Sequence, residues 1–373
     1  MLIVAYLVVA AWVYLAVAHG RFWQAGPQLS TDASQPQMAR VAVVIPARDE
    51  AEHIERTLRA LLRQKYAWPL RVILVDDNST DGTGEIGRAL AADDPRLTVV
   101  QGQPLPAGWT GKMWAVSQGL QHAADADYVL LTDADIIHAP DHLAQLVAAA
   151  QRGQYDLVSE MVRLRCETLP ERFGIPAFVF FFAMLYPFAR VDDRKSNVAA
   201  AAGGTMLLSQ AALQRIDGVS RIRAELIDDC ALAREVKRGG HATWLGHATQ
   251  ATSLREYPQF ADIWQMIART AYVQLQYSPL LLLGTVLGML LLYAAPVLLA
   301  LGTHGVAMWL GLSAWVLMAA LFQPILRRYQ QSPLWGIALP VIAMYYMAAT
   351  VGSAVRFYSG KGGQWKNRTY PAS

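Results

Sequence analysis

The sequence predicts an α/β domain with a mostly parallel sheet, joined to an amino-terminal membrane helix and several carboxyl-terminal ones. Of the 373 residues, 54% are hydrophobic and only 16% are charged, which is too apolar for an ordinary soluble enzyme. Nearly all Asp and Glu lie between about residues 32 and 262, so acid-poor ends flank a polar middle. Within that middle, short apolar runs alternate with helical patterns, as expected for strands alternating with helices.

The chain begins with an uncharged apolar run over residues 1–18. This run is long enough to cross a bilayer. A basic residue, Arg21, follows the run, whereas a signal peptide carries its basic residues before it. We therefore predict an uncleaved membrane anchor in residues 1–20.

Three further apolar runs lie at about 280–302, 305–326 and 334–357. Each is close to the ~20 residues that a membrane helix needs, and a buried core helix is the alternative for any of them. They predict about three membrane helices within residues 279–357. The preceding segment, 261–278, carries aromatic residues and is predicted to be an interfacial helix, and residues 358–373 form a basic tail.

Basic residues at the ends of the apolar runs predict the orientation. Arg21, Arg255 and Arg327 flank the middle domain or face it, so the domain should lie in the cytoplasm. Four simple crossings would put the tail outside, yet the tail carries Arg356, Lys361, Lys366 and Arg368. Either one apolar run is interfacial or re-entrant, or the tail breaks the rule. The two cysteines support no disulfide framework, which suits a reducing compartment.

The middle domain, residues 38–260, divides into strands and helices in order. We predict strands at 41–45, 71–75, 97–101, 128–132 and 206–208, and helices at about 50–64, 84–92, 112–123, 140–152 and 228–237. Ligands of such parallel sheets bind beyond the carboxyl ends of the strands. The apolar segment 173–188 is too short to span and suits an interfacial or re-entrant position beside the membrane, with a buried core helix as the alternative.

Two aspartates follow the strand at 128–132. Asp133 and Asp135 are two residues apart, so in an extended chain they point to the same face. Paired carboxylates there suit a Mg²⁺ or Mn²⁺ ion that carries a diphosphate. Taken alone, two such aspartates more often lie in a solvated turn than in a metal site. The other acids of the domain decide between these two alternatives.

Further polar groups fall at the ends of neighbouring strands. Pro46 and Glu50 follow the first strand, and Asp76 and Asp77 follow the second. Carboxylates in these places can accept hydrogen bonds from a base N–H or from ribose hydroxyls, although a turn that caps the next helix explains the aspartates equally well. The glycine patterns of dinucleotide folds and of P-loops are both absent from the sequence.

Three later positions complete the set of candidates. Lys112, at a probable helix start, could neutralise a phosphate, although a solvated lysine is the commoner case. Gly203 and Gly204 lead into a strand and allow close approach of the backbone to a ligand. Asp228 and Asp229 begin a helix, where the dipole favours acids, and Asp229 is the candidate general base.

Together these segments resemble the inverting, metal-dependent family 2 glycosyltransferases. The resemblance rests on their order: VVIPARDE (43–50), VDDNSTDGT (75–83), GKMWAVSQG (111–119), LTDAD (131–135), AGGTMLLSQAAL (202–213) and IDDCALAREVKRGG (227–240). It covers about 200 residues, from Val41 to near Gly246. The flanking apolar runs are similar to those of the membrane branch with ceramide and carotenoid glycosyltransferases. The strongest likeness is to the hopanoid-associated glycosyltransferases, which implies a multi-pass protein of the bacterial cytoplasmic membrane.

The resemblance implies a GT-A-type nucleotide-sugar-binding domain and a role for each candidate. Asp135, with Asp133, would hold a Mn²⁺ or Mg²⁺ ion, and Asp229 would take the proton from the acceptor hydroxyl. The nucleotide sugar, a UDP-sugar, would be bound by Pro46, Glu50, Asp76, Asp77, Lys112, Asp133, Gly203, Gly204 and Thr205. In the tail, Trp365 and Arg368 could close over the donor, although a basic tail lying on anionic lipid is equally expected.

The expected reaction is inverting transfer of a single sugar to a lipid hydroxyl at the cytoplasmic membrane face. The expected partners are a nucleotide sugar, a lipid acceptor and membrane lipids, with no nucleic acid. Processive members carry Q-x-x-R-W, and here Gln265 and Arg269 are one residue too far apart with no tryptophan after the arginine. The alternatives are a polyprenyl-phosphate or polysaccharide glycosyltransferase, a nucleotidyltransferase, and a non-catalytic membrane scaffold or transporter.

Overall fold

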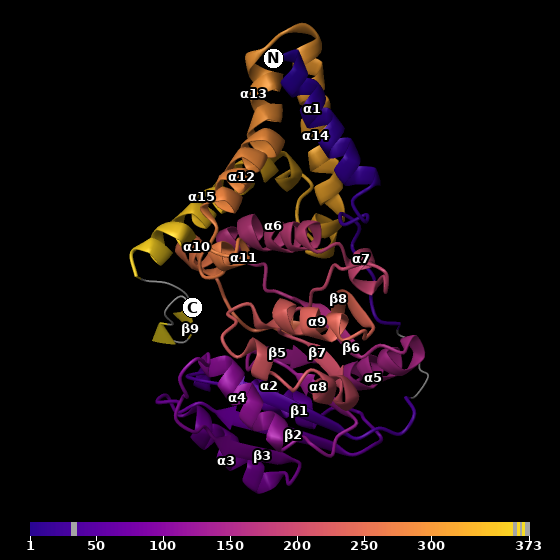
Figure 1. Ribbon diagram of the computed structural model, residues 1–373, viewed down its shortest axis with the longest axis vertical. Helices are drawn as coiled ribbons and strands as arrows, with labels where there is room; N and C mark the ends of the chain where they lie inside the picture. The colour runs from indigo at the N-terminus through magenta and orange to yellow at the C-terminus, as the bar shows by residue number, and fades with distance from the viewer. Residues whose placement is uncertain (31–35, 361–363, 366–367, 370–373) are drawn as a thin grey trace.

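The computed structural model describes residues 1–30, 36–360, 364–365 and 368–369. Figure 1 shows a sheet domain at one end of the molecule and a bundle of long helices at the other, with shorter helices between them. The predicted basic tail, 358–373, lies largely outside the described residues. Its two described pieces, β9 (Gln364–Trp365) and β10 (Arg368–Thr369), pair with each other as an antiparallel ladder.

The sheet has eight strands in the order β3-β2-β1-β4-β7-β6-β8-β5. Their bounds are β1 Val41–Ala47, β2 Leu70–Asp76, β3 Leu97–Gln101, β4 Tyr128–Leu131, β5 Ile136–His138, β6 Leu157–Arg163, β7 Met206–Ser209 and β8 Thr243–Ser253. The first four neighbours are parallel, whereas β7 runs antiparallel to both β4 and β6, and β5 runs antiparallel to β8. In the second half, β6 and β8 also pair in parallel, so four of the seven neighbouring pairs are parallel and three are antiparallel. The sheet is mostly parallel, as expected, but it is mixed. The reason is that β7 returns to the sheet after a long helical excursion.

Helices cover both faces of this sheet, as predicted. They are α2 (Ala51–Leu62), α3 (Thr83–Asp93) and α5 (His142–Gly153) on one face, and α4 (Gly111–Gln121), α8 (Gln210–Arg215) and α9 (Asp228–Arg238) on the other. In β1, Val43 and Ile45 join the first cluster while Ala42 and Val44 join the second. Side chains alternate across a strand, so an unbroken apolar strand is needed where helices bury both faces.

The strand register brings the predicted site residues to one edge. Ala47 pairs with Asp76, and Val44 pairs with Leu131. The residues that follow β1, β2 and β4 therefore leave the sheet together. Figure 1 shows this domain joined to the helical layer through α7 (Phe188–Asp192), α9 and β8, and a 3₁₀ turn at Ser220–Ile222 precedes α9.

In the described part of the chain, three helical stretches are long and apolar enough to cross a membrane, each of 24 residues: Pro279–Gly302, Gly305–Arg328 and Trp335–Tyr358. The first comprises α12 (Pro279–Met289), a π-helical turn at Leu290–Ala294 and α13 (Ala295–Gly302), and the others are α14 and α15. The amino-terminal helix α1, Leu2–Val17, has 16 residues, fewer than the ~20 that a crossing needs. It packs along α13 and α14, so it extends the apolar surface of the bundle (Figure 1).

The π-helical turn has an identifiable cause. Pro296 has no N–H to donate to the carbonyl of Leu292, four residues earlier. The indole Nε1 of Trp12 donates to that carbonyl instead, at 2.9 Å. Trp12 is fully buried and its ring meets Tyr293 edge to face at 5.5 Å. The short helix α1 therefore contacts the bundle at the π-helical turn between α12 and α13.

Both ends of α15 contact the layer of short helices between sheet and bundle, which bears on the conflict over the tail. Near its start, Trp335 contacts Phe173 of α6. Near its end, the Tyr358 hydroxyl lies 3.0 Å from that of Tyr272. Between them, Ser353 Oγ donates to the carbonyl of Ala268 at 2.6 Å. Because α15 rests on this layer along its length, it takes an oblique course beneath α12 and α13 (Figure 1), as expected of the interfacial alternative.

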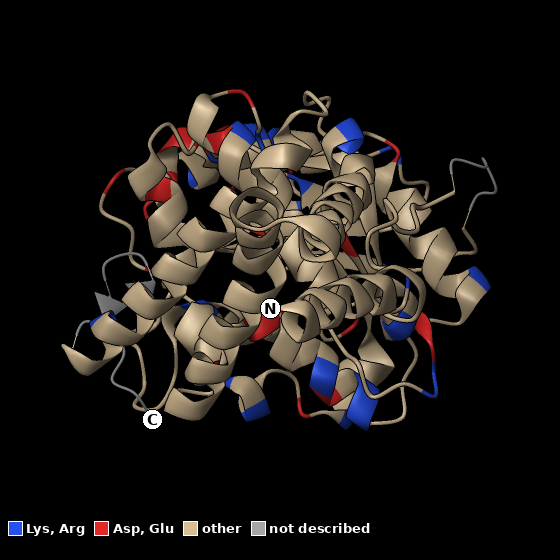
Figure 2. Cartoon of the chain, turned by 90° about the horizontal axis from the view of Figure 1, so that it is seen from above, with Lys and Arg blue, Asp and Glu red and all other residues tan. Residues whose placement is uncertain are grey.

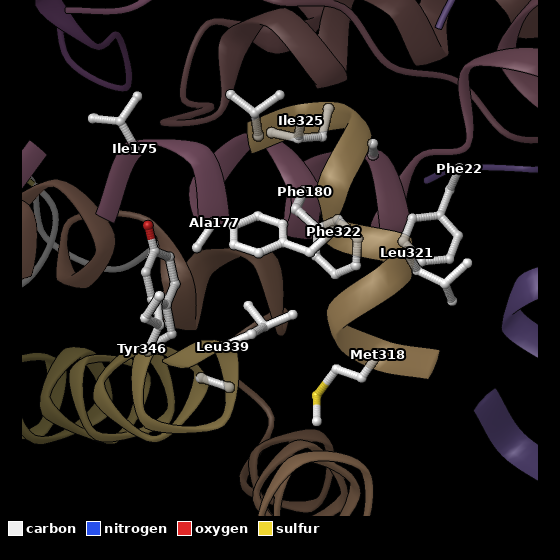
Figure 3. Close-up of a cluster of buried hydrophobic side chains, with 14 of the residues drawn as sticks. Phe22, Ile175, Ala177, Phe180, Met318, Leu321, Phe322, Ile325, Leu339 and Tyr346 are labelled. Carbon is white, nitrogen blue, oxygen red and sulfur yellow. The ribbon is translucent and has the colours of Figure 1, made fainter. Parts of the chain in front are cut away.

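Shorter helices form the layer between sheet and bundle. Most of the predicted apolar segment 173–188 lies in α6, Leu169–Leu185, and its last residue begins α7. Helix α6 begins at a capping box formed by Thr168 and Glu171. Figure 3 shows Phe180 of this helix against Phe322 of α14, with ring centres 5.1 Å apart. α6 is thus a largely buried helix, the alternative that its apolar sequence left open. The predicted single helix 261–278 is two helices, α10 (Phe260–Ala268) and α11 (Ala271–Gln274), which are broken at Arg269 and Thr270.

Charge is distributed as the sequence predicted. Figure 2, seen from the amino-terminal end, shows tan helices at the centre and blue and red segments around them. Arg328, at the end of α14, donates from Nη2 to the carbonyl of Ala248 in β8. The charged end of this helix is therefore held against the sheet domain.

Candidate active site

A cavity of about 770 Å³ lies where the strand ends meet the short helices α6, α10 and α11, which we call the interfacial layer. One side is polar and includes most of the predicted site residues: Pro46, Glu50, Lys112, Asp133, Asp135, Gly203, Gly204 and Asp229. The other side is apolar and aromatic: Phe178 and Phe182 of α6, Met266 of α10, Tyr272 and Val273 of α11, Tyr277, and Phe357 of α15. The fold therefore joins a carboxylate-rich edge to the short helices that pack against the long apolar ones.

Asp229 occupies the first turn of α9. Its Oδ1 accepts from the N–H of Cys230 at 2.7 Å, and its Oδ2 accepts from the N–H of Gly203 at 3.0 Å. Burial and, after it, the neighbouring carboxylate of Asp228 together raise the pKa of Asp229 to about 6, while Lys112 opposes both. A carboxylate with this pKa is ionised at neutral pH and is a stronger base than an exposed aspartate.

Lys112, in the first turn of α4, links two acids of the site. Its Nζ lies 3.0 Å from Asp133 Oδ1 and 3.0 Å from Asp228 Oδ2. Burial disfavours the ammonium, but these two carboxylates raise the pKa of Lys112, so it stays charged. Burial raises the pKa of Asp133, but Lys112, with Arg255 and Arg269, outweighs burial and lowers it. Lys112 is therefore part of the site rather than a solvated surface lysine.

Asp135 and Glu50 are joined by an arginine that sequence reasoning did not place in the site. Arg255 donates from Nε to Asp135 Oδ2 and from Nη2 to Glu50 Oε1, both at 3.0 Å. Burial opposes the charge, but the two carboxylates raise the pKa of Arg255. Arg255 follows β8, which ends at the same edge as β4, and a basic residue directly after a strand was the only available signal.

Some predicted residues do not line the cavity. Asp76 faces the start of α3: its Oδ1 accepts from the Ser79 N–H at 3.0 Å, and a Cβ on Gly84 would lie 2.2 Å from its Oδ2. Asp77 is buried beside Arg48, whose Nη1 donates to the Asp77 carbonyl at 2.6 Å. Thr205 is fully buried under the Gly203–Gly204 turn. Trp365 and Arg368 lie in β9 and β10, so their predicted role stays a prediction.

The lining has a chemical composition that fits a divalent cation. Of the residues that the structure describes, eight carboxylates line the cavity (Glu50, Asp133, Asp135, Glu225, Asp228, Asp229, Glu256 and Asp262), against four cations (Lys112, Arg255, Arg269 and Arg356). An anionic diphosphate would not enter such a site without added positive charge. Mg²⁺ is commonly held by one or two carboxylates together with substrate phosphates, so a preformed cluster of three protein ligands is not required. Among the described residues no such cluster occurs.

Comparison with known proteins gives this arrangement a context. Residues 42–217, slightly less than half of the chain, match the family described as Glycosyl transferase family 2. The match includes β1 to β7 and every candidate residue from Pro46 to Thr205. It ends before Asp229 and Arg255, so those two positions rest on the geometry alone.

Two similar curated proteins act on lipids by name. The chain is 36% identical over 133 residues to an undecaprenyl-phosphate 4-deoxy-4-formamido-L-arabinose transferase of Pectobacterium atrosepticum. It is 33% identical over 173 residues to a 4,4'-diaponeurosporenoate glycosyltransferase of Staphylococcus aureus. These matches cover 35% and 46% of this chain and only 38% and 44% of the relatives' own lengths.

A solved structure resembles the chain over nearly its whole length. It is the mannosyltransferase PcManGT from Pyrobaculum calidifontis, solved with GDP-Man and Mn²⁺. The TM-score is 0.56 at 20% identity, over 95% of this chain and 97% of the other. At this identity the likeness concerns the fold, including the helices that follow the sheet domain.

Proposed function

Because this chain carries a glycosyl transferase family 2 domain, we propose that it transfers a single sugar from a nucleotide sugar to a lipid hydroxyl, with inversion at the anomeric carbon. The observation that carries the proposal is the cavity itself. Asp229, a base with a pKa of about 6, lies in a space whose opposite wall is formed by aromatic and apolar side chains of the interfacial helices. A polar donor and an apolar acceptor can meet only in a site of this mixed kind.

The chemistry follows from the residues present. An acceptor hydroxyl has a pKa far above 7, so Asp229 acts as general base and removes its proton as the new C–O bond forms. The leaving nucleotide gains negative charge, and Lys112 and Arg255 are the cations placed to stabilise it. A single displacement by the hydroxyl inverts the anomeric centre, and no sugar–enzyme intermediate is required.

A divalent ion fits the site, and Asp135 with Asp133 would hold it. When bound, Mn²⁺ or Mg²⁺ supplies positive charge to the diphosphate and orients it. Lys112 pairs with Asp133 and Arg255 pairs with Asp135, so the two aspartates that would hold the ion lie beside the two cations that would contact phosphate oxygens. The similar fold of PcManGT, solved with GDP-Man and Mn²⁺, supports this assignment.

A hydroxyl acceptor agrees better with the site than a phosphate acceptor does. The first relative's name indicates transfer to a polyprenyl phosphate, whose oxygen is already ionised and needs no base. A buried carboxylate with a raised pKa, in a lining with an excess of acids, instead favours a neutral hydroxyl. We propose a hydroxylated lipid such as a hopanoid, a UDP-sugar as donor, and a catalytic domain on the cytoplasmic face of a bacterial membrane.

The test is a transfer assay with detergent-purified protein, Mn²⁺ or Mg²⁺, a panel of UDP- and GDP-sugars, and two acceptor pools. One pool is a neutral lipid extract with hydroxylated lipids, and the other is a polyprenyl phosphate. Metal-dependent nucleotide release with a new neutral glycolipid in mass spectra is the expected result. If a product forms only with the polyprenyl phosphate, the acceptor is a phosphate and the proposal of a hydroxyl acceptor is wrong. No release by folded protein with any donor would favour a scaffold role.

A further inference from the structure

A line of buried hydrogen bonds runs through the domain behind the candidate active site. We call its four side chains, Glu160, His142, His138 and Thr132, the Glu160 network. Glu160 Oε2 lies 2.6 Å from His142 Nε2, and His142 Nδ1 lies 2.8 Å from His138 Nδ1. His138 Nε2 lies 2.9 Å from Thr132 Oγ1, which donates to the carbonyl of Gly204 at 2.8 Å. All four side chains are at most 2% exposed.

The network joins elements that are separate in the sequence. Glu160 lies in β6, His142 begins α5, His138 ends β5, and Thr132 follows β4. The two imidazole rings are nearly coplanar, at 21° with centres 5.0 Å apart, as an in-plane N–H···N bond requires. A buried polar network of this size is stable only when its members satisfy one another.

The protons of the network can be assigned from its far end. The Gly204 carbonyl can only accept, so the single hydroxyl hydrogen of Thr132 points to it, and Thr132 must accept from His138 Nε2–H. Burial, together with His142, keeps the pKa of His138 well below its usual range, so its Nδ1 is an acceptor for His142 Nδ1–H. The three hydrogen bonds from His142 to His138, from His138 to Thr132 and from Thr132 to Gly204 therefore all donate in the same direction.

The network ends beside both halves of the active site. Thr132 directly precedes Asp133, which pairs with Lys112. Gly204 directly follows Gly203, whose N–H donates to Asp229. On the other side of the same turn, Ser159 Oγ accepts from the Ala202 N–H and donates to the Thr205 carbonyl. The turn over residues 202–205 is therefore held from two directions.

We propose that the Glu160 network is a positioning device for catalysis, which holds the Gly204 carbonyl through Thr132 and thereby keeps the Gly203 N–H on Asp229. The inference rests on the proposed role of Asp229 as general base. Thr132 and the histidines touch no reacting atom in this scheme. They act through the turn, whose position decides whether the base keeps its hydrogen-bond donor.

The first arm of the test needs no substrate. Thr132→Val removes the hydroxyl at nearly constant volume, and Thr132→Ala removes it without any risk of overpacking, so the test does not depend on one variant folding. Thr132→Ser keeps the hydroxyl. Thr57→Val is the matched control, because Thr57 is also fully buried and donates to a backbone carbonyl next to the site, that of Ala134 at 2.8 Å, but lies outside the network.

Hydrogen–deuterium exchange of the full-length protein in detergent is the measurement. Amides of the peptide spanning residues 202–205 should exchange about tenfold faster in Thr132→Val and Thr132→Ala, because a buried hydrogen bond is lost. They should be unchanged in Thr132→Ser and in Thr57→Val. Unchanged exchange in both Thr132 variants that lack the hydroxyl overturns the proposal. A similar acceleration in Thr57→Val also overturns it, because the effect would then be general loosening.

The second arm is the pH dependence of nucleotide release. The groups facing Asp229 are Lys112 from α4, Asp228 and Cys230 on α9, and Tyr186 after α6. The Gly203 N–H lowers the pKa of Asp229, so its loss should move the acid limb of the rate profile to higher pH in Thr132→Val but not in Thr132→Ser. If the amides of residues 202–205 exchange faster but the acid limb of the pH–rate profile does not move, the network holds the turn without affecting catalysis, and the proposal is overturned. If the wild-type protein releases no nucleotide, the result counts against the proposed function. The hydrogen–deuterium exchange measurement still tests whether Thr132 holds the turn over residues 202–205.

Discussion

At the scale of single residues, the site depends on one carboxylate that is made basic and on two cations that organise the remaining acids. Burial and Asp228 raise the pKa of Asp229 to about 6, while Lys112 limits that rise. The same lysine lowers the pKa of Asp133. Opposite shifts on neighbouring carboxyl groups are the usual mark of divided acid–base roles.

Replacing Asp229 tests the base directly. Asp229→Asn should reduce turnover at least about 100-fold, because the hydroxyl loses its proton acceptor, while nucleotide binding persists. Turnover is measured by nucleotide release, and binding by calorimetry with UDP and GDP in the presence of Mn²⁺. Asp135→Asn is the comparison, since it should weaken metal-dependent binding as well. Near-normal turnover in Asp229→Asn would remove this residue from the mechanism.

Asp229→Asn should lower turnover but raise the stability of the folded protein at neutral pH. A carboxyl group with a folded pKa of about 6, above its ordinary 3.8, binds protons more readily in the folded state. The free energy of unfolding therefore falls as pH rises from about 4 to above 6. Asp229→Asn should raise the melting temperature above pH 7 and leave it nearly unchanged at about pH 4. Equal shifts at both pH values would mean that the pKa of Asp229 is not raised.

Lys112 offers a test of the charge balance. Lys112→Met removes a positive charge that opposes the rise in the Asp229 pKa, so the acid limb of the pH–rate profile should move up by about one unit or more. The Michaelis constant for the donor should also rise, because a phosphate-facing cation is lost. Lys112→Arg keeps the charge and should leave the limb close to its wild-type position. A limb that stays in place in Lys112→Met would separate Lys112 from the base.

At the scale of secondary-structure elements, local sequence predicted most of the strands and helices but not their environment. The strand at 97–101 and the helix at 84–92 appear within a residue or two of their predicted bounds, as β3 and α3. The run 173–188 was apolar enough to lie on a membrane, yet α6 packs between α14 and α15 (Figure 3). An apolar sequence predicts that a helix is buried away from water. Whether protein or lipid surrounds the helix depends on the elements that pack against it.

The interruption of the first long apolar helix gives a prediction at this scale. Trp12→Phe should lower stability by about 1 kcal/mol, because the Leu292 carbonyl loses its indole donor. Pro296→Ala restores a backbone N–H that can donate to the same carbonyl. The cost of Trp12→Phe should therefore be much smaller in the Pro296→Ala background. Thermal unfolding of the wild type, the two single variants and the double variant in one detergent gives a double-mutant cycle. Additive changes in stability would show that Trp12 and Pro296 act independently.

At the scale of the whole molecule, the course of α15 bears on the predicted side of the carboxyl-terminal tail. Trp335 and Tyr358, at its two ends, both contact the interfacial layer, and Phe357 lines the same cavity as Asp229. This arrangement agrees with the basic residues of the tail, which favour the side of the catalytic domain. The turn between α13 and α14, at Thr303 and His304, lies at the far end of the bundle (Figure 1).

Cysteine labelling tests this topology. In a Cys166→Ser background, His304→Cys and Ser359→Cys are labelled with a membrane-impermeant maleimide in intact spheroplasts and in inverted vesicles. His304→Cys should react only in spheroplasts and Ser359→Cys only in vesicles, because α15 begins and ends on the side of the catalytic domain. Labelling of both positions from the same side would mean that α15 crosses the bilayer.

The sequence was sufficient for the alternating elements, the apolar helices and the acids at the strand ends, because periodicity and composition act over a few neighbouring residues. Asp133, Asp135 and Asp229 could be selected on that basis, and all three line the cavity. The tertiary structure alone decided the pairing of Arg255 with Glu50, 205 residues apart, the position of Lys112 between Asp133 and Asp228, and the mixed direction of the sheet. It also decided that Asp76 faces a helix start and that α15 lies along the interfacial layer. Such contacts join segments far apart in the chain, and their geometry is fixed only when the whole core packs.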